Sequence, residues 1–303
     1  MTIEECKDQL SLLVALGYPF HSEYLCPFCK RYISDPAQIS REDAPQDALG
    51  GKKIALTCKD CNNTYGHTID CHLINFITDS EDRILPAGMN RRFVFHDKER
   101  GHEFRGQLEV LPGGEMRMVL PKQINDPAIL GAEIQNLSVN DVVIAEMATN
   151  KEKRIPQNIA AAMLKIAYVI LFSYFGYSFL MDAFYDRIRA QINNPSQAII
   201  PEGLISREGV FDNYPDGVYA CETPPLRGFL ILFTLKKRDE HKYSVFIPVK
   251  SNGLDEAADC LRLIKGGYLL KARRVQTSSD YWNNPDTIQS VIAWTESTEL
   301  EWK

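Results

Sequence analysis

Two Cys-x-x-Cys pairs constrain this chain more than any other feature of its sequence. Cys26 and Cys29 lie in Cys-Pro-Phe-Cys, and Cys58 and Cys61 lie in Cys-Lys-Asp-Cys. A turn with two intervening residues lets both sulfurs reach one ion about 2.3 Å away, and two such turns supply four ligands. Four thiolates close the coordination sphere of zinc, so the spacing predicts a structural zinc rather than a catalytic one.

The other interpretations of these cysteines are disulfides or a redox pair. The chain begins Met-Thr-Ile-Glu-Glu, without a basic and apolar leader, so we expect a cytoplasmic protein, in which disulfides are rare. A redox Cys-x-x-Cys is expected once, beside a βαβ pattern, and not twice. The remaining cysteines have no paired spacing and are expected to be ordinary buried residues: Cys6, Cys71, Cys221 and Cys260.

Length and composition indicate a globular protein of 303 residues, enough for one large domain or two ordinary ones. The net charge of −6 argues against non-specific coating of nucleic acid, but it is compatible with a local basic groove. One apolar stretch, residues 159–181, is long enough to span a bilayer. Because Lys165 interrupts it and Pro156 suits a first helical turn, we expect a buried core helix and no membrane.

The apolar spacing predicts an α+β fold, with a small zinc-stapled ββα module followed by a larger mixed β and helical region. Helices are expected over residues 3–16, 156–175, 182–192 and 255–264. Strands are expected over 92–96, 103–111, 115–120, 217–221, 229–236, 243–249 and 290–294, with 134–146 continuing the β region. The expected parts are an N-terminal helix (1–20), the zinc module (21–80), a β hairpin region with a helical pair (81–200) and a C-terminal β-rich region (201–303).

The segment around the cysteines carries an ordered set of further motifs. Cys-Pro-Phe-Cys is followed by Ser-Arg-Glu-Asp-Ala-Pro, Leu-Gly-Gly, Leu-Thr-Cys-Lys-Asp-Cys-Asn-Asn, and then a Gly and Ile-Asp. In this order the motifs resemble the zinc-stapled HNH endonuclease family, over residues 21–80 only. The resemblance implies a ββα-metal nuclease core, in which a hairpin acid and helix groups hold one divalent ion and a hairpin histidine activates water.

This sequence departs from the family pattern at the residue that would carry the chemistry. The resemblance places Glu42 at the acidic position, Pro45 at the hairpin proline and Asn62 at the helix-start ligand. Asp43 occupies the position of the water-activating histidine, and an ordinary aspartate is ionised and a weak base at neutral pH. The family's asparagine before the second cysteine pair is also missing from residues 53–57.

Two accounts fit this departure. In the first, the site is rearranged but active, because a helix over this segment would place Asn63, His67 and Asp70 on one face. These groups would join Glu42 and Asp43 around one Mg²⁺ or Mn²⁺, with His67 as a relocated base or ligand. In the second, catalysis has been lost, and the module is a zinc-held platform that binds nucleic acid or a partner protein.

The Gly50-Gly51-Lys52-Lys53 run reads either as a hairpin loop or as a close approach of backbone and two ammonium groups to a phosphate. The leading interpretation is a metal-dependent endonuclease that acts on DNA, with RNA as the alternative substrate. Lys52 and Lys53 would face phosphates. The catalytic candidates are Glu42, Asp43, Asn62, Asn63 and His67, with Asp70 as a further ligand.

Residues 81–303 contain no phosphate-binding Gly-x-x-x-x-Gly-Lys run, no dinucleotide fingerprint and no Gly-x-Ser-x-Gly. A third interpretation therefore makes the zinc module a folding staple for this larger region. The region would then hold an activity of its own, bind a protein partner or form a homo-oligomer.

Overall fold

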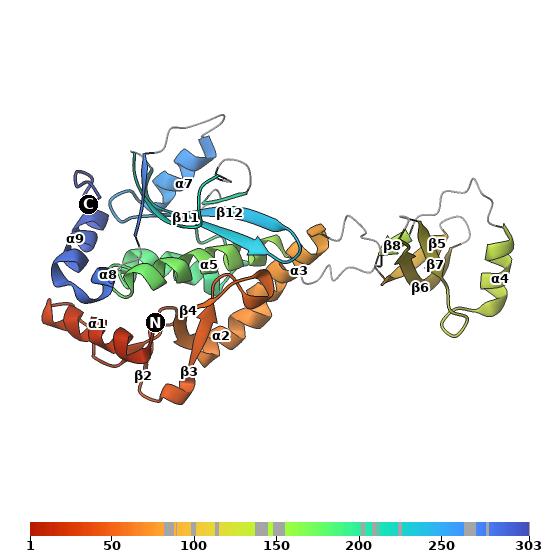
Figure 1. Cartoon of the computed structure of the whole chain (residues 1–303), viewed down its shortest axis with the longest axis horizontal. Helices are drawn as coiled ribbons and strands as arrows, with labels where there is room; N and C mark the ends of the chain where they lie inside the picture. The colour runs from red at the N-terminus through yellow and green to blue at the C-terminus, as the bar shows by residue number, and fades with distance from the viewer. Residues whose placement is uncertain are drawn as a thin grey trace. The chain divides into compact units, whose positions relative to one another are not determined.

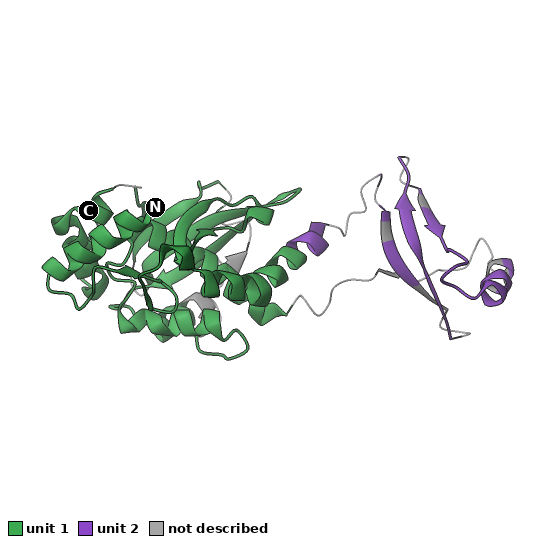
Figure 2. Ribbon diagram, turned by 90° about the horizontal axis from the view of Figure 1, so that it is seen from below, with its two compact units in different colours: residues 1–76, 153–303 green, residues 77–152 purple. Residues whose placement is uncertain are grey.

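The computed structural model describes the chain except residues 82–87, 89, 98–100, 113–114, 137–144, 148–154, 201–203, 208–210, 212, 224–225, 264–270, 277–278 and 303. It divides into two compact units: unit 1 comprises residues 1–76 and 153–303, and unit 2 comprises residues 77–152 (Figure 2). Helices and sheets occur in separate blocks, so the predicted α+β class is confirmed.

The N-terminal part of unit 1 carries both cysteine pairs. Helix α1 (Ile3–Ala15) begins with a capping box between Thr2 and Glu5 and ends before Gly17, whose φ of 91° favours glycine. The first cysteine pair lies between the short paired strands β1 (Tyr24–Leu25) and β2 (Tyr32–Ile33). The following elements are β3 (Ile39–Asp43), β4 (Lys53–Cys58), α2 (Lys59–Tyr65), a π-helical turn (Gly66–Asp70) and α3 (Cys71–Glu81).

Helix α5 (Pro156–Phe175) is the central element of unit 1, and its bounds match the prediction. It contacts strand β4 and the π-helical turn on one side and strands β10 (Gly217–Thr223), β11 (Leu226–Lys236) and β12 (Glu240–Pro248) on the other (Figure 1). By length and composition, α5 is the one helix in the described part of the chain that can cross a membrane. However, 78% of its apolar stretch is buried inside the protein, which is typical of the core helix of a soluble protein.

The C-terminal part of unit 1 is built on an antiparallel five-stranded sheet. Its strand order is β13 (Ala272–Arg274), β10 (Gly217–Thr223), β11 (Leu226–Lys236), β12 (Glu240–Pro248) and β9 (Ile205–Arg207). The same part of unit 1 contains four helices: α6 (Asp186–Asn193), α7 (Leu254–Leu263), α8 (Asp280–Asn283) and α9 (Pro285–Glu296). Aromatic rings join this sheet to α5 and the segment after it; for example, Phe179 stacks on Phe229 with centroids 5.4 Å apart.

Two sequence predictions about secondary structure are wrong. Residues 290–294, predicted as a strand, lie inside helix α9, whose N-terminus is capped by the side chain of Asn284. Their apolar side chains form the buried face of a helix, and a run of five residues is too short to separate the two periodicities. In the predicted β continuation, Ile134 belongs to helix α4 (Pro127–Asn136) and Ala145–Met147 forms β8, while residues 137–144 lie outside the described chain.

Unit 2 is a small antiparallel sheet with its own core. The strand order is β7 (Met116–Val119), β6 (His102–Val110), β5 (Asn90–Asp97) and β8, so the three strands predicted before residue 121 are confirmed. Phe93, Phe104, Leu108 and Leu130 of α4 are buried together, with Leu120 packed against them. This cluster explains the alternation of apolar residues along β6.

Candidate metal centre and buried ion-pair cluster

The four cysteines predicted to bind zinc lie together in unit 1. Their Sγ atoms all lie within 4.8 Å of one another. The Cys26 and Cys61 sulfurs are 3.9 Å apart, and the Cys29 and Cys58 sulfurs are 3.8 Å apart. Four sulfurs about 2.3 Å from a central zinc would lie about 3.8 Å apart at the corners of a tetrahedron. The cluster therefore fits a structural metal such as zinc.

Local backbone structure presents each cysteine pair to the centre. The first pair closes a tight loop, in which the Lys30 amide donates to the Cys26 carbonyl at 3.0 Å and Lys30 adopts a φ of 56°. The second pair begins helix α2, where the Cys61 amide donates to the Cys58 sulfur at 3.3 Å. Cys58 ends strand β4 and is the N-cap of helix α2. The first turn of the helix therefore brings the sulfurs of Cys58 and Cys61 close enough to bind one metal ion.

Arg31 offsets negative charge on the sulfurs. Its Nε lies 3.3 Å from the Cys29 sulfur, and its outer nitrogen lies 2.8 Å from a carboxylate oxygen of Asp60. Hydrogen bonds from the neighbouring thiols, with Arg31 in addition, hold the pKa of Cys29 below its usual range. The hydrogen bond with Cys26 lowers the pKa of Cys58 to about 6. Hydrogen bonds with Cys29 and Cys58 raise the pKa of Cys26, so the thiols share protons, and metal binding would displace the protons that remain.

A second cluster surrounds the ammonium group of Lys165, on helix α5. Its Nζ lies 2.6 Å from Glu42 Oε1 and 2.6 Å from Asp70 Oδ2. All three residues are buried, with exposed fractions of 1% for Lys165, 2% for Glu42 and 7% for Asp70. One ammonium therefore bridges two carboxylates that come from strand β3 and from the π-helical turn.

Neighbouring side chains complete the hydrogen bonding of this cluster. The Gln46 amide donates to Asp70 Oδ1 at 2.6 Å, and the Thr57 hydroxyl donates to Glu42 Oε2 at 3.3 Å. Lys165 also lies over the ring of Tyr65, 5.3 Å from its centroid. We refer to Glu42, Asp70, Lys165 and Gln46 as the Lys165 cluster. Its polar atoms are largely satisfied, which is the condition under which buried charges are tolerated.

Burial and charge act in opposite directions in the Lys165 cluster. Burial raises the pKa of Glu42, and the charge of Lys165 opposes that rise. Burial by itself would lower the pKa of Lys165, but the charges of Asp70 and Glu42 outweigh it and raise the pKa. The ammonium is therefore fully protonated at neutral pH, and the cluster holds a cation permanently between its carboxylates.

Of the predicted ligands of a divalent ion, the structure brings Glu42 and Asp70 together around Lys165, whereas Asp43 and His67 have other surroundings. Glu42 is buried and Asp43 is half-buried, and the register of the β3–β4 pair shifts between these two residues. His67 is exposed although Asp70 is buried. Both residues lie in the π-helical turn, whose wider winding shifts the register expected for an α-helix. Within the described residues of unit 1, the four cysteines are the one group of three or more candidate ligands.

The two asparagines of the predicted site have separate surroundings. Asn62 donates from its side chain to the Ser40 hydroxyl at 3.0 Å and to the Arg41 carbonyl at 3.2 Å. It therefore ties the start of α2 to strand β3. Asn63 is exposed.

Burial raises the pKa of Asp43, and the charge of Lys53, its cross-strand neighbour, opposes that rise. Asp43 is thus close to a basic residue.

Lys165 and Gln46 were not among the site residues predicted from the sequence. The available signal was a lone lysine within an apolar helix, which requires an anionic partner when the helix is buried. Spacing gave no indication of that partner, because Asp70 is 95 residues away from Lys165 in the chain. The lysine was interpreted only as evidence against a membrane span.

The Gly50-Gly51 loop brings the predicted phosphate-binding lysines next to a distant hairpin. Lys52 and Lys53 are exposed. A Cβ added at Gly50 would lie 3.1 Å from the Cβ of Lys236, at the end of strand β11. Lys236 is also exposed, and its ammonium lies 2.6 Å from Glu240. The loop that precedes Lys52 and Lys53 therefore packs against the end of strand β11.

Gly51→Ala should lower the free energy of unfolding by about 1–3 kcal/mol, the usual cost of overpacking. A Cβ at this position would lie 1.6 Å from the Pro45 carbonyl oxygen, so the loop must shift to admit it. Gly66→Ala is the matched control, because a Cβ there meets nothing within 4 Å and the backbone is helical. Urea unfolding of both variants measures the difference. Equal stability of the two variants would contradict the tight loop.

No protein family, curated protein or solved structure matches this chain. The function therefore has to be argued from the cysteine centre, the Lys165 cluster and the basic surface around Lys52 and Lys53.

Proposed function

We propose that residues 21–80 form a zinc-held module, similar to the HNH family in its motifs, that binds nucleic acid without cleaving it. The observation that carries this proposal is the Lys165 ammonium, 2.6 Å from both Glu42 and Asp70. The proposed substrate is DNA, with RNA as the alternative, and the proposed compartment is the cytoplasm. Zinc is the metal proposed for the cysteine centre.

Lys165 stands where a catalytic cation would be needed. Glu42 is the acid that the family resemblance assigns to the divalent ion, yet its two oxygens already accept from Lys165 and Thr57. A Mg²⁺ or Mn²⁺ at the same oxygens would lie close to an ammonium and be repelled by it. The water-activating histidine is also missing, because Asp43 stands in its place. The arrangement therefore favours the second sequence account, in which catalysis has been lost.

The basic surface supports the binding part of the proposal. Lys52, Lys53 and Lys236 are exposed in unit 1, and Gly50 of the preceding loop packs against Lys236, whose ammonium is paired with Glu240. Contacts between lysines and phosphates supply affinity that does not depend on sequence and that falls with rising salt. A local surface of this kind is compatible with the overall charge of −6, because only the contact region has to be basic.

Lys52→Gln/Lys53→Gln should weaken binding to labelled duplex DNA by about tenfold at low salt, because two phosphate contacts are lost. Fluorescence anisotropy at several salt concentrations measures it, and the slope of log K against log salt should become shallower by about 0.9 for each lost contact. The single variant Lys53→Gln is compared with Lys122→Gln, which removes one charge from an exposed lysine of unit 2 and serves as the control for a charge change outside the proposed binding surface. Absence of binding by the zinc-loaded wild type to duplex, single-stranded DNA and RNA would contradict the proposal.

The same samples decide whether the module cleaves. We expect plasmid DNA and RNA to remain intact with magnesium, with manganese and with EDTA. Metal-dependent cleavage by the wild type that is lost in Glu42→Ala or His67→Ala, with unchanged zinc content, would instead establish the rearranged nuclease site of the first sequence account.

A further inference from the structure

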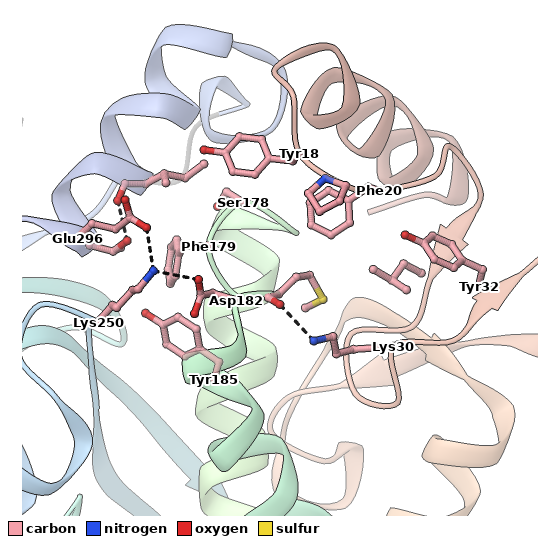
Figure 3. Close-up of a pocket in the computed structure, with 15 residues that line it drawn as sticks. Tyr18, Phe20, Lys30, Tyr32, Ser178, Phe179, Asp182, Tyr185, Lys250 and Glu296 are labelled. Atoms are coloured by element: carbon pink, nitrogen blue, oxygen red, sulfur yellow. Dashed lines mark hydrogen bonds and ion pairs between the residues drawn. The ribbon is translucent and has the colours of Figure 1, made fainter.

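A cavity of about 370 Å³ lies in unit 1 beside the first cysteine pair. Its walls come from the segment after α1, the loop of the first cysteine pair (residues 25–32, called the zinc loop below), the segment between α5 and α6, the segment after β12, and helix α9 (Figure 3). Small-molecule sites in proteins are typically clefts of about 300–1,000 Å³ with apolar walls and a few polar groups. Neither the nuclease motifs nor the Lys165 cluster makes use of this cavity.

Aromatic side chains form much of the wall. The cavity is lined by Tyr18, Phe20, Tyr32, Phe179 and Tyr185. Phe179 and Tyr185 are buried, with ring centroids 5.5 Å apart, while Tyr18, Phe20 and Tyr32 are half-buried around the opening. Aromatic faces arranged in this way bind a planar ring by stacking and edge contacts, whatever its exact substituents.

The charged groups of the wall compensate one another. Two ammonium groups, of Lys30 and Lys250, and two carboxylates, of Asp182 and Glu296, line the cavity. Lys250 lies 3.3 Å from Asp182 and 3.1 Å from Glu296. Lys30 Nζ donates to the Met181 carbonyl at 3.3 Å. Since these charges sum to zero, the cavity favours a neutral ligand over a multiply charged anion such as a nucleotide phosphate.

One buried polar group of the wall lacks a partner. The Tyr185 hydroxyl makes no hydrogen bond within the described residues, although the side chain is only 1% exposed. In Figure 3 this hydroxyl points into the group of pocket side chains, on the side of Lys250 and Asp182. A buried hydroxyl without a partner is unfavourable, so such a group at a cavity wall indicates where a ligand atom is bound.

We propose that this cavity binds a neutral nucleobase, either as a free nucleoside or as an unstacked base of a single strand. The aromatic walls would hold the ring, the Tyr185 hydroxyl would donate to a ring nitrogen or carbonyl, and the carboxylates of Asp182 and Glu296 would accept from an exocyclic amine. The inference does not depend on the basic surface around Lys52 and Lys53, which lies outside the cavity wall.

Because Lys30 and Tyr32 belong to the zinc loop, the cavity also depends on the metal centre. Lys30 directly follows Cys29, and its ammonium bridges to the segment between α5 and α6. All binding measurements therefore use the full chain with its zinc content verified.

Calorimetric titration with adenosine, guanosine, cytidine and uridine tests the inference. We expect at least one nucleoside to bind the wild type, and Tyr185→Phe to weaken that binding by about tenfold, the loss of one hydrogen bond. Tyr24→Phe is the matched control, because its hydroxyl is also buried without a partner in the described chain but does not line the cavity. It should bind the nucleoside like the wild type.

Three further measurements cover a variant that does not fold and distinguish a free nucleoside from a base in a strand. If Tyr185→Phe does not fold, Phe20→Ala, at the half-buried opening, replaces it and should weaken binding by a similar factor. Competition by a single-stranded oligonucleotide that is lost in Tyr185→Phe would identify a base in a strand, and its absence would identify the free nucleoside. Lys52→Gln/Lys53→Gln should leave nucleoside affinity unchanged even if strand binding fails. No heat of binding up to about 1 mM nucleoside, or equal affinity in Tyr185→Phe and Tyr24→Phe, would overturn the inference.

Discussion

Lys165→Met should lower the free energy of unfolding by about 3–5 kcal/mol, the usual cost of breaking a buried ion pair by removing one partner. Methionine keeps much of the length and volume of lysine but leaves Glu42 and Asp70 buried and facing each other without the ammonium 2.6 Å from both. The two carboxylates would repel each other in a region with little water. Urea unfolding of the zinc-loaded protein at neutral pH measures the loss.

The triple variant Lys165→Met/Glu42→Gln/Asp70→Asn is the control for this effect. It removes all three charges at nearly constant volume, and replacing a complete buried ion-pair cluster is often close to neutral in stability. We therefore expect the triple variant to recover most of the stability that Lys165→Met loses. A triple variant as unstable as the single one would show that the loss comes from packing and not from charge.

The pH dependence of the single variant provides a second readout. Burial raises the pKa of Glu42 above its ordinary 4.5 even with Lys165 present. Without the ammonium that opposes this rise, the pKa should go up further, so the variant gains stability as pH falls toward the raised value. In the wild type, the pKa of Lys165 is raised above 10.5. Its contribution is therefore fully present below 10.5 and is lost only as pH rises through the raised value.

The sequence predicts structure best where a feature is determined by residues that are close together in the chain. The two Cys-x-x-Cys spacings predicted the four-cysteine cluster, because each pair needs only one turn or helix N-cap to place both sulfurs. The bounds of α5 followed from Pro156 and a long apolar run. Residues 290–294 were misread as a strand, because a short apolar run carries no decisive periodicity.

The set of residues that form the Lys165 cluster could not be predicted, because it depends on contacts between segments that are distant in the sequence. Glu42 is among the residues that the sequence motifs single out, but its ion-pair partner Lys165 belongs to another part of the chain. The π-helical turn that contains His67 and Asp70 has no clear sequence signal. Buried Gln9 is a similar case, since its amide donates to the carbonyls of Phe175 and Tyr281 at 3.0 and 3.1 Å. The role of each of these residues depends on contacts with residues that are distant in the sequence, so local sequence patterns do not reveal it.

Removal of the proposed zinc should cost the protein most of its stability, on the order of 5 kcal/mol or more. The zinc loop is anchored in the core: the Tyr168 hydroxyl donates to the Pro27 carbonyl at 3.0 Å, and the Tyr177 hydroxyl donates to the Leu25 carbonyl at 2.7 Å. Without the metal, the loop and these buried hydrogen bonds would lose their constraint together. Thermal unfolding after treatment with a strong zinc chelator, followed by zinc addition, measures the loss and its reversal.

Cys58→Ser tests the same point without a chelator, because it removes one ligand and the sulfur that caps helix α2. Zinc content measured by mass spectrometry should fall from one equivalent toward zero, with a lower melting temperature. Cys260→Ser is the control, since Cys260 lies outside the four-cysteine cluster and is only half-buried, and it should keep both zinc and stability. Full zinc content in Cys58→Ser would contradict a site with four cysteine ligands. Loss of zinc without loss of stability would instead mean that the contacts of Tyr168 and Tyr177 hold the loop by themselves.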